Sequence, residues 1–386
     1  MLDLIHSPLF EYSGNGTIMF DNDSPLQAVF RIKLLSNGII EGEITFPYFH
    51  PNISKFVKDM TQFSLKGEDN KIGHHILADD CIFESLSQKF SYQDIRVKGI
   101  FSSKKVTIHV PGLSDQKLDG EILLDFGITN VHRIPAINVV SRVGSLCLAN
   151  YEGIEERQKY MTVFKTPLIT SSIRIVTRAE KDQRLGNIIG NAREVVEDFL
   201  KVTSLSQGVW HDWAFLSVYL SHMNPDVIQY QILHSPILKA PSFRLLTPFG
   251  YSQQFVDSIF SGYSRKLATD YGFDLALEWY IESNADAAVE TNFLNATTCL
   301  ELLMDKLLSE KKLDQLLSDE DFKVYYARIC ESSQEILESL NKEEQVINAV
   351  KSSLRQVQRM SFVSKIRSLI DYWGVTIEDT RIKVMT

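Results

Sequence analysis

The fold of the first part of the chain is decided by the stretch Ala28-Val-Phe-Arg-Ile-Lys-Leu-Leu-Ser-Asn-Gly-Ile-Ile-Glu-Gly-Glu-Ile-Thr-Phe46. Two runs with alternating apolar residues, 28–35 and 39–46, flank Ser36-Asn37-Gly38. Such alternation is typical of a strand with one buried face. Asparagine and glycine both tolerate a positive φ, so Asn-Gly between two such runs is a strong hairpin signal. The stretch therefore predicts an antiparallel hairpin.

Further strands are expected at 95–101, 105–110, 121–128 and 171–176. The run at 105–110 alternates and then stops at Pro111-Gly112, a turn-forming pair. Many short strands without intervening helices favour an antiparallel sandwich or barrel-like sheet. We expect the first 176 residues to form a β-rich, sandwich-like antiparallel region.

Helical patterns begin near residue 177. Residues 179–206 carry apolar side chains at three- and four-residue spacing, and 209–220 are expected to form a buried strand or short element. Ser318-Asp-Glu-Asp321 has the pattern of a helix-capping box. In the last part of the chain, helices are expected at 273–281, 289–309, 322–340, 342–360 and 362–372. Helices with such short connections are typical of a bundle.

The pattern predicts an α+β protein with two domains. The first, 1–267, is β-rich to about residue 176 and mixed α/β over 177–267. The second, 268–386, is a helical bundle. A chain of 386 residues is too long for one ordinary core, which agrees with this division.

Composition excludes several classes of protein. A net charge of −9 argues against coating nucleic acid through bulk charge, although a local basic groove stays open. No apolar run reaches the roughly 18 residues that span a bilayer, and the first residues do not resemble a secretory signal. The four cysteines are far apart without metal-ligand spacing, so reduced thiols are expected. We expect a cytoplasmic protein with no membrane association, no metal and no cofactor.

Three segments carry a family resemblance: Leu275-Ala-Leu-Glu-Trp-Tyr280, Glu290-Thr-Asn-Phe-Leu-Asn-Ala296 and Cys299-Leu-Glu-Leu-Leu303. They resemble the HEPN domain of ApeA-type proteins, which are bacterial phage-defence proteins. The apolar segment 362–374, ending in Asp-Tyr-Trp-Gly, is similar to the approach to the last helix of that family. The region before residue 270 resembles the large ApeA N-terminal domain, so the resemblance covers nearly the whole chain.

The resemblance implies a metal-independent endoribonuclease fold that acts as a dimer. HEPN nucleases use an arginine followed four to six residues later by a histidine, near the start of the last helix. RNA cleavage needs a base for the 2′-hydroxyl and positive charge near the phosphorane oxygens. In this sequence every histidine lies at or before His234, and Arg381 is followed five residues later by Thr386.

The sequence therefore carries no catalytic residues of this type. Two interpretations stand: a chain that stops before the motif, or a non-catalytic member of the family. The first is favoured, because a helical bundle is not expected to end without its final core helix. Whether the natural protein is an enzyme is left open by the sequence.

Candidate binding residues are few. Lys351, Arg355 and Arg359 stand at i, i+4 and i+8 on a predicted helix. They would form either an RNA-contacting rim or an ordinary solvated helix face. Glu301 matches the glutamate of the family's LExL segment. It would organise the site or form a structural ion pair.

Two further groups are more readily explained by structure than by function. Adjacent His74 and His75 would point to opposite faces of a strand, which makes a poor metal site. We therefore expect both histidines to be ordinary polar residues on the surface. The segment Trp210-His211-Asp212-Trp213 is either an aromatic recognition patch or, as favoured, part of the core.

The leading expectation is an anti-phage defence protein of the abortive-infection type. Its N-terminal region would sense a phage-derived trigger, and its helical module would belong to an RNase fold acting on RNA, with tRNA as one candidate. The alternative is a non-catalytic binding protein whose bundle serves for assembly. Both imply a homodimer through the helical bundle.

Overall fold

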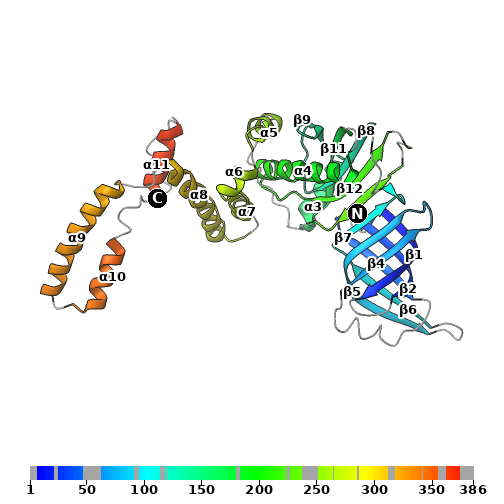
Figure 1. Cartoon of the computed structure of the whole chain (residues 1–386), viewed down its shortest axis with the longest axis horizontal. Coiled ribbons are helices and arrows are strands. Elements are labelled where there is room, and N and C mark those ends of the chain that lie inside the picture. Colours follow the sequence, from blue (N-terminus) through cyan, green and yellow to red (C-terminus); the bar gives the residue numbers. More distant parts are fainter. Residues whose placement is uncertain are drawn as a thin grey trace. The chain divides into compact units, whose positions relative to one another are not determined.

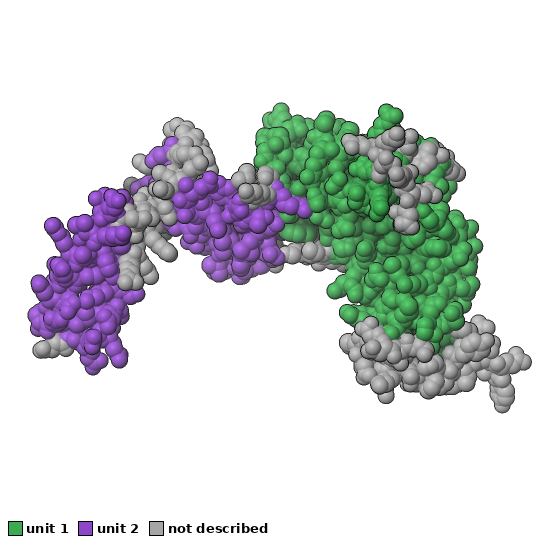
Figure 2. Space-filling model, in the orientation of Figure 1, with its two compact units in different colours: residues 1–263, 284–286 green, residues 264–283, 287–386 purple. Residues whose placement is uncertain are grey.

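The computed structural model describes residues 7–20, 25–46, 62–90, 95–113, 118, 120–179, 183–221, 223, 227–236, 251–263, 265–284, 287–311, 318–340, 342–354 and 362–373. The chain separates into two compact units (Figure 2). Unit 1 comprises residues 1–263 and 284–286, and unit 2 comprises 264–283 and 287–386. The sequence-based division at 267/268 falls inside α6 (Arg265–Asp270), whose residues belong to unit 2.

The thirteen described strands of unit 1 form one antiparallel sheet. They are β1 (Pro8–Phe20), β2 (Leu26–Leu35), β3 (Ile40–Phe46), β4 (Gln62–Asp69), β5 (His75–Phe90), β6 (Ile95–Ser102), β7 (Lys105–His109), β8 (Gly120–Thr129), β9 (Ile137–Ser141), β10 (Gly144–Asn150), β11 (Ile169–Ala179), β12 (Trp213–Leu220) and β13 (Tyr230–His234). The helices of unit 1 are α3 (Ile154–Phe164), α4 (Leu185–Gln207) and α5 (Ser252–Phe260). The strands and helices predicted from the sequence before residue 267 are all present, with shifted ends.

Six strands close into a barrel, in the order β4-β1-β2-β3-β6-β5, because β5 pairs back with β4 (Figure 1). The barrel interior is filled by side chains such as Phe30, Phe46 and Phe101, each at most 2% exposed. Of the two arrangements expected from the strand pattern, a sandwich and a barrel-like sheet, this part of the chain forms the barrel. A single curved sheet encloses the core, since the 16-residue β5 has partners along both of its edges.

The predicted hairpin joins β2 to β3. Gly38 has φ +84°, and the Asn37 side chain accepts a hydrogen bond from the Ile39 backbone N–H at 3.0 Å. The hairpin turn is buried, since Ser36 is 2% and Asn37 6% exposed. Ile169 of β11 donates its N–H to the Ser36 carbonyl at 2.8 Å, so the turn is held by the second half of unit 1.

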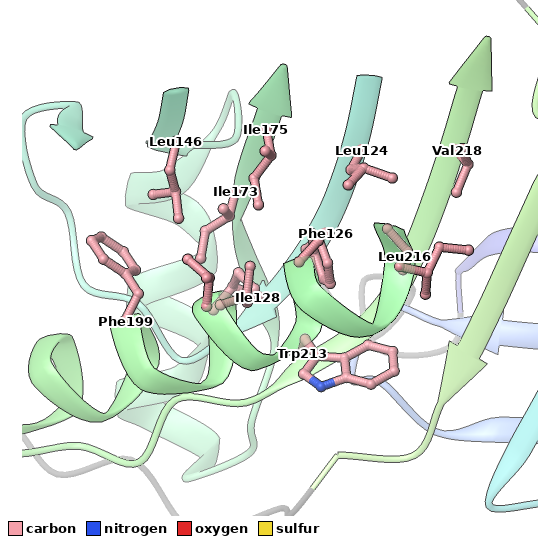
Figure 3. Packing of buried hydrophobic residues seen from close by; sticks show 14 of the residues in the cluster. Leu124, Phe126, Ile128, Leu146, Ile173, Ile175, Phe199, Trp213, Leu216 and Val218 are labelled. Carbon is pink, nitrogen blue, oxygen red and sulfur yellow. The ribbon is translucent and has the colours of Figure 1, made fainter. Parts of the chain in front are cut away.

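The other strands continue from the barrel as an open sheet, in the order β7-β13-β12-β8-β11-β10-β9. The amphipathic α4 covers one face of this sheet, as the spacing of its apolar residues predicts. Figure 3 shows the resulting core, in which Phe199 of α4 lies beside apolar side chains of β8, β10 and β11. This face uses one alternate set of strand residues, so the other set lies on the opposite face of the sheet.

Unit 2 is helical. Besides α6 it contains α7 (Phe273–Ser283), α8 (Val289–Lys311), α9 (Asp319–Ser339), α10 (Glu344–Leu354) and α11 (Phe362–Trp373). The helix α8 packs against α7 and α11, whereas α9 packs against α10. Ser318 caps α9, with its hydroxyl accepting the Asp321 N–H at 3.1 Å, as the sequence predicts. The predicted helix 342–360 is described only to Leu354.

A prediction concerns Gly42 of β3, which pairs directly with Phe101 of β6. A β-carbon at Gly42 would overlap the Phe101 ring, which is fully buried and cannot turn aside. Gly42→Ala should therefore lower the free energy of unfolding by roughly 1–3 kcal/mol. Gly186→Ala is the matched control, because a β-carbon there meets nothing within 4 Å and α4 gains about 0.5–1 kcal/mol from alanine. Urea unfolding of both variants checks this, and a Gly42→Ala protein as stable as the unsubstituted protein would contradict the packing described.

Candidate functional site

The basic row expected on the helical unit is only partly described. Lys351 lies half-buried on α10, and its ammonium donates to Gln334 Oε1 of α9 at 2.6 Å. Arg355 and Arg359 lie outside the described residues. Lys351 therefore links two helices, and its role as an RNA contact stays a prediction.

Glu301 is exposed on α8, whose buried side includes Met304 and Leu308. Because α8 packs against α7 and α11 while α10 packs against α9, no described packing brings Glu301 to Lys351. The proposed organising role of Glu301 stays untested.

The segment 210–213 belongs to the core, as favoured from the sequence. His211 and Trp213 are each 4% exposed. The two ring nitrogens of His211 lie 3.1 Å from Thr203 Oγ1 and 3.1 Å from Gln207 Oε1. Burial lowers the pKa of His211 to about 3, so this imidazole is neutral and holds α4 to the start of β12.

The prediction that both histidines lie on the surface is wrong for His74, which is buried, although His75 is exposed. His74 is 4% exposed because the β4–β5 turn folds it back, with its carbonyl accepting the Asp69 N–H at 2.9 Å. The Asp69 carboxylate accepts the N–H groups of Lys71 and Ile72, each at 2.9 Å. Burial lowers the pKa of His74.

A second polar group, not predicted from the sequence, lies on the sheet face opposite α4. Strand pairing sets Gln231 of β13, Ser217 of β12, Asp125 of β8 and Arg174 of β11 side by side in one row. We call these four residues the polar row. Phe215 lies two positions before Ser217, and Leu233 lies two positions after Gln231, so both are on the same face of the sheet. Both belong to the barrel core, so this face continues into the barrel interior.

Hydrogen bonds tie the polar row to the barrel. The Tyr12 hydroxyl of β1 donates to Gln231 Oε1 at 2.6 Å, and Gln231 Nε2 donates to Ser217 Oγ at 2.8 Å. Gln231 and Ser217 are 0% and 1% exposed. Their amide and hydroxyl groups are paired with one another, which is the condition for keeping polar groups inside a core.

Asp125 is the least satisfied member of the polar row. Its side chain is 16% exposed, and the Arg174 Nε lies 3.7 Å from Oδ1, an ion-pair distance too long for a hydrogen bond. The buried Oδ1 atom has no hydrogen-bond partner among the described residues. Burial raises the pKa of Asp125 to about 6, and the Arg174 guanidinium offsets only part of this effect.

Two tyrosines lie close enough to Asp125 to share its electrostatic field. Burial raises the pKa of Tyr219 and Tyr151, and the Asp125 charge raises both further. The Arg157 guanidinium lies 5.9 Å from the centre of the Tyr151 ring, and its Nη1 donates to the Ile169 carbonyl at 2.7 Å. Phenol, guanidinium and carboxyl groups thus lie near one another around Asp125. This set of side chains can recognise a polar ligand through directed hydrogen bonds.

The sequence offered little to distinguish Asp125. It was predicted to lie in the strand 121–128, where a polar residue at every second position is ordinary alternation. Its burial and its neighbours depend on pairing with β11 and β12, which lie about 50 and 90 residues further along the chain. A carboxyl kept buried with an unpaired oxygen is more typical of a functional site than of a stabilising contact.

No set of three or more histidine, cysteine, aspartate or glutamate side chains in the described ranges is arranged to hold a metal ion. None of the helices, as far as the structure describes them, has the length and apolar character needed to cross a bilayer. Comparisons of the chain with protein-family models, curated proteins and solved structures found no match.

Replacing Asp125 should reveal the cost of burying it. Between the ordinary aspartate pKa of 3.8 and the folded value of about 6, the folded protein binds a proton that the unfolded chain releases. Stability is therefore lost as pH rises through this window and stays lost above it. Asp125→Asn should raise the free energy of unfolding by about 1–3 kcal/mol at pH 8 and by much less at pH 4. Glu121→Gln, at an exposed site on the same strand, is the control.

Thermal melting of both variants across this pH range makes the test. An Asp125→Asn protein that is less stable at pH 8 would show that the carboxylate is well paired, and one that is equally stabilised at both pH values would show that burial does not raise its pKa.

Proposed function

We propose that the protein is an anti-phage defence protein of the ApeA type. Unit 1 recognises a phage-derived trigger, and unit 2 is a HEPN-type helical module directed at RNA. The observation that carries the proposal is the α7–α8 helix pair. The residues of the family resemblance fall on these two helices, which pack against one another. Ala276, Leu277 and Ile281 of α7 and Cys299 of α8 are buried.

The polar row supports a recognition role for unit 1. Proteins keep a buried carboxyl at a cost to stability mainly where binding or catalysis needs it. Asp125, Arg174 and Tyr219 would bind a polar group of the trigger through charge and hydrogen bonds. The proposal places recognition and RNA contact on different units of one chain.

Under this proposal the chain does not cut RNA. Every histidine of the sequence lies at or before His234, so none belongs to unit 2. HEPN chemistry needs a proton-transfer group in the helical module, and imidazole is the side chain whose ordinary pKa suits that task near neutral pH.

A second candidate function, assembly through the helices, is favoured by the surface of α8. Val289, Phe293 and Leu300 are 80%, 64% and 48% exposed. They stand at i, i+4 and i+11, which places them within one narrow stripe of the helix. An exposed apolar stripe of this kind marks a contact surface, and two copies of the chain would bury it by pairing α8 with α8.

The purified chain is predicted to leave total RNA and tRNA intact in the presence of EDTA, because unit 2 has no histidine. Gel electrophoresis after prolonged incubation tests this, with a metal-independent ribonuclease of known activity as the positive control. RNA fragments whose yield follows the protein peak through successive columns would contradict the prediction.

Dimer formation is predicted to depend on the α8 stripe. The double substitution Phe293→Ser with Leu300→Ser should weaken the dimer at least roughly tenfold, since it removes two large apolar side chains from the contact. Val324→Ser on α9 is the control, because Val324 is 60% exposed and lies outside the stripe. Light scattering over a concentration series measures the effect. A chain that is monomeric at tens of micromolar would refute α8 pairing.

A further inference from the structure

The open sheet has one free end. Among the strands that the structure describes, β9 is the last in the order and pairs only with β10, whereas the first strand, β4, is closed by β5. A free edge presents unpaired N–H and C=O groups that can pair with another chain. Proteins usually block such an edge with charges, proline or a covering element.

The strand β9, Ile137-Asn-Val-Val-Ser141, contains neither a charge nor a proline. Its Val140 side chain is 88% exposed, a large value for an apolar residue. Nothing within the strand would repel a second strand of the same sequence.

A side chain from α5 instead occupies the edge. Gln253 Oε1 accepts the Asn138 N–H at 2.9 Å, and Gln253 Nε2 donates to the Asn138 carbonyl at 3.0 Å. These two bonds are the pair that one residue of an added strand would make. The remaining Nε2 hydrogen of Gln253 is directed to Asp257 Oδ1 at 2.8 Å, which fixes the amide on the helix.

The Gln253 contact also shows which groups of β9 face outward. The N–H and C=O of alternate residues point to the same side of an antiparallel strand. Since Asn138 points away from β10, Val140 does so as well. The backbone N–H and C=O groups that face away from β10 are therefore those of Asn138, which Gln253 covers, and those of Val140.

The helix that carries Gln253 is held to unit 1 by an apolar face that includes Phe255, Val256 and Ile259 and packs against the core of the open sheet. Val256 is fully buried, and Phe260 meets Phe199 of α4 edge to face, with ring centres 5.4 Å apart. In sequence, α5 ends at Phe260 and unit 1 ends at Tyr263. The helix that covers the free edge is thus the last described element of unit 1 before unit 2 begins.

We propose that α5 is a removable cap on the β9 edge, and that release of Gln253 allows β9 to pair with β9 of a second copy of this chain. The second copy is the occupant because β9 lacks the charges that would prevent self-pairing, and because two identical antiparallel strands can pair about a two-fold axis. This contact is separate from the α8 stripe. Because α5 covers the β9 edge, any change that shifts α5 would expose this edge for pairing.

The test compares full-length variants by light scattering and amide hydrogen exchange. Gln253→Ala removes both bonds and should raise the molecular mass at least twofold relative to the unsubstituted protein, because each copy then offers a second self-pairing surface. Asn138→Ala is the matched control and should change nothing, because Gln253 binds only the backbone of Asn138. Adding Val140→Lys to Gln253→Ala should restore the original mass, since an edge lysine prevents strand addition.

Hydrogen exchange follows the edge itself. The Asn138 amide should exchange roughly tenfold faster, or more, in Gln253→Ala/Val140→Lys than in Val140→Lys alone, because the first protein has an open, unpaired edge. The proposal is overturned if Gln253→Ala keeps the original mass, if Val140→Lys fails to reverse the association, or if exchange at Asn138 does not change. A dimer that forms through α8 would persist in all of these variants and so cannot imitate the predicted pattern.

Discussion

The structure of unit 1 depends on the sharing of β5 between the barrel and the open sheet. Along one edge, residues 82–90 of β5 pair with β6 and residues 75–79 pair with β7. The break between β6 and β7 is bridged by Ser103, which is 4% exposed and whose hydroxyl donates to the Asp79 carbonyl at 2.8 Å. From this point β6 continues into the barrel through β3, and β7 continues into the open sheet through β13. One side of β5 thus sets the position of both halves, and with it the position of the polar row at the barrel end.

Local sequence signals were sufficient where the structure is local. The Asn37-Gly38 turn, the apolar face of α4 and the Ser318 cap each depend on residues close together in the chain, and all three were predicted correctly. The strand β1 was missed because Ser13-Gly14-Asn15-Gly16 has the composition of a turn. In the structure Gly14 lies within β1. A glycine is needed there because the backbone of β4 occupies the space that a β-carbon would fill.

Barrel closure and the polar row could not be predicted from local sequence patterns, because both depend on which strands pair with one another. The β4–β5 pairing that closes the barrel, and the burial of Asp125 beside Arg174, both follow from contacts between strands that no periodicity encodes. The same limit applies to the helical unit. The spacing of Lys351 predicted an exposed cation, whereas its half-buried ammonium is bound to Gln334 of a neighbouring helix.

The proposed division of labour gives RNA contact to unit 2 and leaves recognition of the trigger to unit 1. Ultraviolet cross-linking of the full chain to tRNA, followed by mass spectrometry of the cross-linked peptides, measures this directly. The account predicts cross-links within residues 264–386, and above all in the segment that carries Lys351. Cross-links confined to residues 1–263 would contradict it, because RNA would then be bound by the barrel and sheet.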